Sequence, residues 1–208
     1  LELCDGPFLE LINMAMLPGN ETKPFVMVIE EINRGNPAQI FGELLTLLEA
    51  DKRTAEHALR LCYQKEGECR ELLIPPNIYL IGTMNVADSS LALVDFALRR
   101  RFAFFTLEPC FNDIWATVLH EKYEVPQEMV RIIRAKMTTL NKTIADDPTL
   151  RAQYAVGHSY VTPREKVENA GQWFRDVIES EIAPLLQEYW FDNNDKLLGT
   201  VTELKRDM

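Results

Sequence analysis

The sequence predicts an α/β protein in which a parallel sheet with flanking helices is followed by a helical region. Apolar, β-branched runs at Phe25–Ile29 and Asn77–Asn85 have the pattern of strands that are covered on both faces. A helical pattern lies between these two runs, which is the order expected of an α/β fold. From Phe111 onward the apolar residues recur at helical spacing, and no convincing parallel strand follows.

The first elements in chain order are a short helix and a strand. Leu9–Leu17 carries apolar residues at near-helical spacing and stops at Pro18-Gly19. Phe25–Ile29 then predicts a strand, and two acids, Glu30 and Glu31, follow it at once. These acids should therefore lie at the carboxyl edge of the sheet.

A longer helix and a β-hairpin are expected next. Asn36 provides an N-cap, Pro37 suits the first helical position, and the helical pattern ends near Asp51. Leu59–Leu61 and Glu71–Ile74 are separated by a polar stretch, so they predict a hairpin inserted before the next core strand.

The sheet region continues with the strand Asn77–Asn85, a helix at Ser90–Leu98 and a third strand at Phe102–Leu107. Beyond a boundary placed near Glu108-Pro109, the pattern is helical. The sequence thus predicts two domains, 1–109 and 110–208. Long helices are expected over Ile114–Tyr123, Gln127–Ile144 and Gly171–Tyr189.

Composition limits the classes of protein. The chain has 208 residues, of which 47% are hydrophobic and 26% are charged, so it can bury a core. Its longest apolar runs are far short of the roughly 20 residues that cross a bilayer, so we expect a cytoplasmic protein without membrane contact. The formal charge of −10 argues against a surface that coats DNA phosphates. The four cysteines form no C-x-x-C pair, so neither a zinc site nor a redox motif is indicated.

Glu30 and Glu31 are the first candidates for chemistry. An apolar strand that ends in two acids is the arrangement in which one acid holds the magnesium shell and the next polarises an attacking water. A strand that leaves the core also often meets solvated acids. The pair alone therefore allows either interpretation.

Asn85 ends the next strand. Residues at the carboxyl ends of adjacent strands converge on one crevice of an open α/β sheet, where an amide can orient a water against a γ-phosphate. Asn85 could also begin an Asx-turn into Ala87-Asp88-Ser89, and the two roles can coexist.

Three arginines, Arg99, Arg100 and Arg101, lie between a predicted helix and a predicted strand. Such side chains can project onto the nucleotide of a neighbouring subunit as arginine fingers. They also suit the negative end of a helix dipole, and we expect that role for at least one of them. We favour Arg100 and Arg101 over Arg99 as fingers.

Four segments carry a recognisable joint pattern, and a fifth lies in the helical region. The four are Glu30–Asn36, Phe41–Leu44, Met84–Asp88 and Ala97–Phe102. Together they closely resemble McrB-type AAA+ NTPases of modification-dependent restriction systems, and Gly157–Tyr160 resembles a short motif of the family's helical lid.

The resemblance implies a partial AAA+ P-loop NTPase core followed by an α-helical lid. Glu30 matches the Walker B metal position, although many relatives have aspartate there, and Glu31 matches the catalytic acid. Asn85 matches sensor 1, and Arg100 and Arg101 match the arginine-finger region. The periphery of the nucleotide site is expected at Asn33, Arg34, Asp88, Asp95 and His158. For His158, a buried or capping role is an equal alternative.

The chain contains no G-x-x-x-x-G-K-[ST] loop, whose amides, lysine and hydroxyl cradle the phosphates. We therefore expect a fragment without the Walker A region, which binds nucleotide poorly by itself. The missing strand is expected between Asn77–Asn85 and Phe102–Leu107 in the sheet.

The resemblance also implies a function for the full-length protein. It would hydrolyse GTP or ATP with Mg²⁺ in a homo-oligomeric ring and power a McrC-type nuclease, reaching DNA indirectly or through an N-terminal domain. One alternative is a remodelling ATPase of the MoxR or midasin kind. Another is a noncatalytic assembly scaffold, although the retained Glu31, Asn85 and arginines argue against it.

Overall fold

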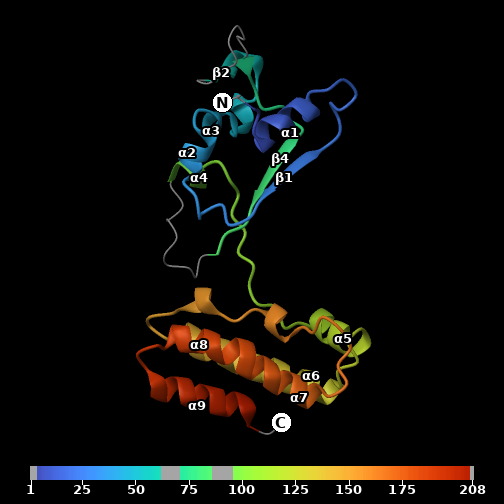
Figure 1. Cartoon of the computed structure of the whole chain (residues 1–208), viewed down its shortest axis with the longest axis vertical. Helices are drawn as coiled ribbons and strands as arrows, with labels where there is room; N and C mark the ends of the chain where they lie inside the picture. Colours follow the sequence, from blue (N-terminus) through green and yellow to red (C-terminus); the bar gives the residue numbers. More distant parts are fainter. Residues whose placement is uncertain (1–3, 62–70, 86–95, 207–208) are drawn as a thin grey trace. The chain divides into compact units, whose positions relative to one another are not determined.

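The computed structural model describes residues 4–61, 71–85 and 96–206 (Figure 1). Contacts divide the chain into two units, Leu1–Phe105 and Thr106–Met208, and each has its own hydrophobic core. The first unit, called the α/β unit below, holds a small parallel sheet. The second, called the helical unit, holds the long helices. Within the described residues, no helix is long and apolar enough to cross a membrane.

The sheet of the α/β unit pairs β1 (Phe25–Ile29) with β4 (Ile78–Gly82) in parallel, with Phe25 opposite Ile78 and Ile29 opposite Gly82. The two core strands predicted from apolar runs are confirmed. Because parallel strands need a long crossover, the helices and short strands between them carry the chain back to the start of the sheet.

The two faces of this sheet differ. One face packs against the core that includes Ile12 and Ala15 of α1 (Pro7–Ala15), which lies beside the sheet in Figure 1. The other face carries apolar side chains that are each at least half exposed, and these are Val26, Val28, Tyr79 and Ile81. The sequence pattern predicted burial on both faces. In the described residues only one face is covered.

A buried amide holds α1 and the sheet together. The side chain of Asn77, only 9% exposed, donates to the carbonyl oxygens of Asn20 at 2.9 Å and Lys23 at 3.1 Å. The loop that enters β1 is thereby joined to the residue before β4. A buried polar group requires such partners, so this amide fixes where the two strands begin.

The helix predicted from Asn36 to near Asp51 is broken into two. The segments α2 (Pro37–Phe41) and α3 (Leu44–Leu47) are separated at Gly42, whose φ of 51° lies in the left-handed region. Glycine adopts that conformation without a Cβ penalty, so the chain turns there. Two 3₁₀ turns follow, η1 (Ala50–Lys52) and η2 (Ala55–His57).

The expected hairpin is described only at its base. β2 (Leu59–Arg60) pairs antiparallel with β3 (Glu71–Leu72), with Leu59 opposite Leu72. Residues 62–70, which would connect the two strands, lie outside the described residues. The pairing agrees with a hairpin, whose turn stays a prediction.

The third predicted strand, Phe102–Leu107, is wrong. The chain leaves α4 (Phe96–Arg99) and continues without strand structure, and Phe105 and Leu107 are 85% and 94% exposed. A strand needs a neighbour to accept its backbone hydrogen bonds, and no described strand provides one for this segment. Of the helix predicted at Ser90–Leu98, residues 90–95 lie outside the described residues.

The helical unit is built from five α-helices within the described residues, four of which were predicted in whole or part. Two 3₁₀ turns, η3 (Ala152–Tyr154) and η4 (His158–Val161), interrupt the loop that follows the second helix. Figure 1 shows the helices after residue 126 lying side by side. Their bounds are α5 (Asp113–Glu121), α6 (Gln127–Ala145), α7 (Ala170–Val177), α8 (Ala183–Tyr189) and α9 (Asn194–Lys205).

A π turn, η5 (Ile178–Ile182), joins α7 to α8 and makes one continuous helical segment. Pro184 stands just after the π turn, at the start of α8. Buried side chains recur along the segment at every fourth residue, and all of them are at most 2% exposed. They are Phe174, Ile178, Ile182, Leu186 and Trp190.

A buried carboxylate attaches α9 to the rest of the helical unit. Asp147 accepts hydrogen bonds from Lys196 of α9, from Thr149 Oγ1 at 2.6 Å and from Trp190 Nε1 at 2.9 Å. The Lys196 ammonium, followed by the Thr149 and Trp190 donors, holds the pKa of Asp147 well below its usual range. The Lys196 ammonium also lies 4.8 Å from the centre of the Trp190 ring.

Candidate functional site

The parallel pairing of β1 and β4 brings the ends of both strands to one edge of the sheet. Glu30 and Glu31 follow β1, and Thr83 to Asn85 follow β4. Glu30, Glu31 and Asn85 are all exposed there. The acids and the amide singled out in the sequence thus leave adjacent strands at the same edge, which is called the catalytic edge below.

Backbone hydrogen bonds continue past the last ladder pair and join the two loops of the catalytic edge. Thr83 N–H donates to the Ile29 carbonyl at 3.0 Å, and Ile32 N–H donates to the Thr83 carbonyl at 2.9 Å. Between these two bonds, Glu31 N–H donates to the Thr83 hydroxyl oxygen at 3.2 Å. Thr83 therefore makes three bonds to the end of β1 and the loop that follows it, at Ile29, Glu31 and Ile32.

Glu31 has an unusual backbone conformation. Its φ of 50° lies in the left-handed region, which is costly for a residue with a Cβ. The chain turns sharply there, and Ile32 packs against Gly82, where an added Cβ would lie 3.1 Å from the Ile32 side chain. Backbone strain of this kind concentrates at functional sites, and it persists only where the surroundings hold it.

Asn33 links the two loops a second time. Its side-chain amide donates to the Asn85 carbonyl oxygen at 3.3 Å, and the residue is only 7% exposed. The Asn33 Oδ1 atom is buried without a hydrogen-bond partner in the described part of the chain. Asn33, predicted at the periphery of the site, thus lies beneath the edge and connects to the backbone of Asn85.

Arg34 forms an ion pair with the Glu31 carboxylate, and both side chains are well exposed. An exposed pair of this kind contributes little to stability, so solvent or a ligand can separate it. Glu30 and Glu31 present the hard carboxylate oxygens that Mg²⁺ prefers. Within the described residues no group of three or more acidic, histidine or cysteine side chains is arranged to hold a metal ion, so the magnesium site stays a prediction.

The structure separates the two predicted finger arginines. The Arg101 side chain is 5% exposed, and its guanidinium lies 2.8 Å from a carboxylate oxygen of Glu49 within the same unit. This pairing favours a structural role for Arg101, since a side chain that reaches another subunit must be accessible. Arg100, by contrast, is exposed at the end of α4.

Asp88 and Asp95, two further predicted site residues, lie outside the described residues. His158 belongs to the helical unit. Its Nδ1 atom accepts a hydrogen bond from Cys110 N–H at 3.1 Å, and its ring meets Phe111 edge to face. Nδ1 is the acceptor of this bond, which joins His158 to the segment before α5. A place for His158 at the nucleotide site stays a prediction.

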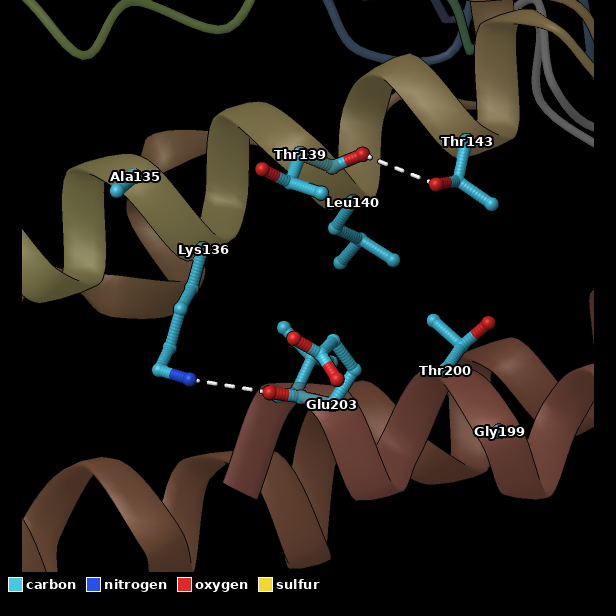
Figure 2. A pocket seen from close by; sticks show the side chains of 9 residues that line it. Ala135, Lys136, Thr139, Leu140, Thr143, Gly199, Thr200 and Glu203 are labelled. Carbon is cyan, nitrogen blue, oxygen red and sulfur yellow. Dashed lines mark hydrogen bonds between the residues drawn. The ribbon is translucent and has the colours of Figure 1, made fainter. Parts of the chain in front are cut away.

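The helical unit contains a cavity of about 350 Å³ between α6 and α9, which Figure 2 shows from close by. Its charged groups already have partners within the protein. Lys136 donates to the carbonyl oxygens of Glu203 and Arg206, and the Glu203 carboxylate pairs with Arg206. None of the predicted site residues lines the cavity, so it is a gap between packed helices and no part of the predicted site.

Sequence reasoning missed two residues that contact predicted site residues. Thr83 could have been noticed as a hydroxyl residue two positions before Asn85, at the end of a buried strand. Glu49 gave no such signal, because it pairs with Arg101 across 52 positions of sequence. Sequence patterns indicate structure formed by residues near one another in the chain, whereas the pair of Arg101 with Glu49 forms only when the chain folds.

Comparisons with known proteins support the same interpretation of the chain. Residues 2–102 match the family model of the AAA domain (dynein-related subfamily), and residues 132–198 match that of the McrB alpha-helical lid domain. The chain is 38% identical over 85% of its length to the "Type IV methyl-directed restriction enzyme EcoKMcrB subunit" of Escherichia coli (strain K12). It is 32% identical over 50% of its length to the "Type II restriction enzyme BsuMI component YdiS" of Bacillus subtilis (strain 168). The aligned parts span 40% and 32% of these two relatives.

Proposed function

Because the chain belongs to the McrB-type AAA+ proteins, we propose that the full-length protein hydrolyses a nucleoside triphosphate, GTP or ATP, at the catalytic edge. The observation that carries the proposal is the parallel pairing of β1 with β4, which places Glu31 and Asn85 at the ends of adjacent strands. In an open α/β sheet, ligands bind in the crevice outside those strand ends.

The side chains at this edge have distinct tasks in the proposed reaction. The Glu31 carboxylate accepts a proton from the attacking water, and the Asn85 amide orients that water toward the γ-phosphate. Glu30 would hold Mg²⁺ together with the substrate phosphates, and the ion would neutralise charge on the transferred phosphoryl group. For Glu31 Oε2 to accept the proton, Arg34 would have to release it, because the ion pair engages that oxygen.

Arg100 is proposed as the arginine finger of a ring of identical subunits. It is exposed, whereas Arg101 is buried and paired with Glu49. A finger supplied by a neighbour stabilises charge in the transition state, so the site is complete only at an interface between two subunits. Arg101 then acts by holding the end of α4 in place.

We propose that hydrolysis powers a separate McrC-type nuclease that cleaves DNA. Both relatives bear the names of restriction-enzyme components, and the match to the McrB lid favours this role over a MoxR-like or midasin-like remodelling ATPase. The exposed acids and the left-handed turn at Glu31 favour a working site over a noncatalytic scaffold. DNA would be bound by the nuclease or by another part of the full-length protein, because this chain is acidic.

Steady-state hydrolysis of GTP and ATP by the full-length protein tests the proposal. We expect Mg²⁺-dependent turnover, and we expect Glu31→Gln to lower kcat by about 10²- to 10⁴-fold, because glutamine cannot accept a proton. Nucleotide binding should persist in the variant. Glu128→Gln is the matched control, since Glu128 is an exposed glutamate of the helical unit.

Two outcomes would contradict the proposal. A wild-type protein that hydrolyses neither nucleotide, with or without a partner nuclease, would favour the scaffold. A Glu31→Gln variant as active as Glu128→Gln would show that hydrolysis occurs without the proposed base.

A further inference from the structure

We propose that Thr83 is a positioning residue for Glu31. Its hydroxyl oxygen accepts the Glu31 amide hydrogen and fixes the left-handed backbone from which the Glu31 carboxylate acts. This inference rests on the proposed function, because it concerns how the proposed base is held. Thr83 itself touches neither substrate nor metal in this role.

The geometry shows why the hydroxyl is needed. The strand ladder continues past β1 and β4 through the backbone of Thr83, which bonds to Ile29 on one side and Ile32 on the other. Glu31 lies between these two anchored residues. Its own N–H donates to the Thr83 side chain, so the hydroxyl supplies the acceptor where the loop turns.

The left-handed backbone of Glu31 makes its bond to the Thr83 hydroxyl important for the position of the carboxylate. A glutamate with φ of 50° is in a sparsely populated region and returns to a more extended backbone unless its neighbours prevent that. Such a rotation would change the direction of its Cα–Cβ bond and move the carboxylate. Small displacements of a catalytic group are costly in rate, and a shift of about 1 Å can cost about 10²-fold.

The Thr83 bond holds the backbone of Glu31, whereas Arg34 pairs with its side chain. That pair ties the carboxylate to a residue of its own loop, and both partners are exposed. Because Thr83 holds the Glu31 backbone, the Glu31 side chain can separate from Arg34 while its Cα atom keeps its position. Without the bond to Thr83, we expect the Glu31–Arg34 ion pair to determine the conformation of the loop. The Glu31 carboxylate would then point toward the substrate for less of the time.

Hydrolysis by the full-length protein is measured for Thr83→Val, which has the shape of threonine without the hydroxyl, and for Thr83→Ser, which keeps the hydroxyl. We expect Thr83→Val to lower kcat by about ten- to a hundredfold with little change in KM, and we expect Thr83→Ser to stay within about twofold of the wild type. Thr202→Val is the matched control, because the Thr202 hydroxyl also bonds to backbone, at the Leu198 carbonyl, in the helical unit.

A second measurement separates positioning from general weakening of the fold. If Thr83 acts through Glu31, adding Thr83→Val to Glu31→Gln should lower kcat no further, since the base is already absent. A second full loss in the double variant would overturn the proposal. Should Thr83→Val fail to fold, the pair Thr83→Ala and Thr83→Ser still differs in the hydroxyl alone, and equal rates for the two would overturn it as well.

The outcomes also distinguish this inference from the proposed function. Wild-type turnover that collapses in Glu31→Gln but persists in Thr83→Val would overturn the role of Thr83 and leave the hydrolytic function intact. A wild-type protein without turnover would overturn both.

Discussion

The catalytic edge of the α/β unit and the core of the helical unit use polar side chains in opposite ways. In the helical unit, the Asp147 carboxylate is buried and its oxygens take hydrogen bonds from three residues. At the catalytic edge, Glu30, Glu31 and Asn85 remain exposed, and the bonds that order them involve mainly the backbone. Polar groups thus fix packing in the core of the helical unit, whereas those that leave the strands at the catalytic edge stay accessible.

The apolar residues show the same contrast. Phe174 and its neighbours in the helical unit are enclosed on all sides, whereas one face of the β1–β4 sheet leaves Val28 57% exposed. The helical unit therefore has a complete core within this chain. We infer that substitutions in the helical unit act mainly on stability, and that substitutions at the catalytic edge act mainly on rate.

The largest effect is expected from Arg100→Ala, which should lower kcat by about 10³-fold or more while thermal unfolding stays unchanged. In the proposed ring, the exposed Arg100 side chain would stabilise the transition state at a neighbouring subunit, and its exposure means that its loss should leave the core of its own unit intact. Steady-state hydrolysis and a thermal melt of the same preparation measure both quantities. Arg99→Ala, which removes the adjacent exposed arginine, is the control.

Mixing two variant subunits tests whether Arg100 acts across a subunit interface. Rings formed from equal amounts of Arg100→Ala and Glu31→Gln should regain part of the lost activity, because some interfaces then combine an intact base with an intact finger. Mixed rings that remain as inactive as either variant would show that Arg100 does not act across an interface.

Phe174→Ala tests whether the core of the helical unit is enclosed. Phe174 is fully buried, and replacing a buried phenylalanine by alanine costs about 3–5 kcal/mol in the free energy of unfolding. Urea unfolding of the full-length protein, followed through the helical signal, measures this loss. Phe191→Ala should change little, because Phe191 is 83% exposed. Equal losses for the two variants would contradict an enclosed core.

Asp147→Asn is expected to have a smaller effect, of about 2 kcal/mol at neutral pH, because it weakens charge-assisted hydrogen bonds in a buried site. The pKa of Asp147 is depressed in the folded protein, chiefly by Lys196. Its stabilising contribution is therefore complete above the unfolded pKa of about 4 and is lost as the pH falls below it.

Unfolding free energies measured between pH 7 and pH 3 check both parts of the Asp147 prediction. The difference between the wild type and Asp147→Asn should be largest near pH 7 and should shrink in the acid range. Asp146→Asn, at the exposed neighbouring carboxylate, is the control, and its free energy of unfolding at pH 7 should stay close to that of the wild type. A constant difference across the range would contradict the depressed pKa.

The sequence predicted the elements whose pattern is local. The strands at Phe25–Ile29 and Ile78–Gly82 are short apolar runs with clear ends, and each forms where it was expected. The run Phe102–Leu107 has a similar composition, yet it forms no strand, because strand formation depends on a neighbour that a local pattern does not reveal. The break at Gly42 was missed because apolar residues continue at helical spacing on both sides of it, so the local pattern predicts one unbroken helix.

The helix α9 escaped the sequence prediction for a different physical reason. Gly199 and three β-branched residues after it lower the helix propensity of its middle. Packing of Leu204 and the bond from Lys196 to Asp147 stabilise the helix instead, and both depend on the folded unit. At the catalytic edge, the acids and Asn85 were visible as motifs, whereas Thr83 gains its importance only through pairing with the other loop.

The π turn between α7 and α8 has a consequence for insertions and deletions. Side chains four positions apart drift by about 40° per step around an α-helix, so a stripe from Phe174 to Trp190 would wind away from the core. The wider turn at Ile178–Ile182 absorbs one extra residue and cancels part of this drift. The number of residues between the buried side chains of this segment therefore matters to its packing as much as their identity does. A single-residue deletion within Ile178–Ile182 would let this turn revert to an α turn and keep Leu186 and Trp190 on the buried face, whereas a deletion in the regular part of α7 after Phe174 would rotate both side chains by about 100° away from the core.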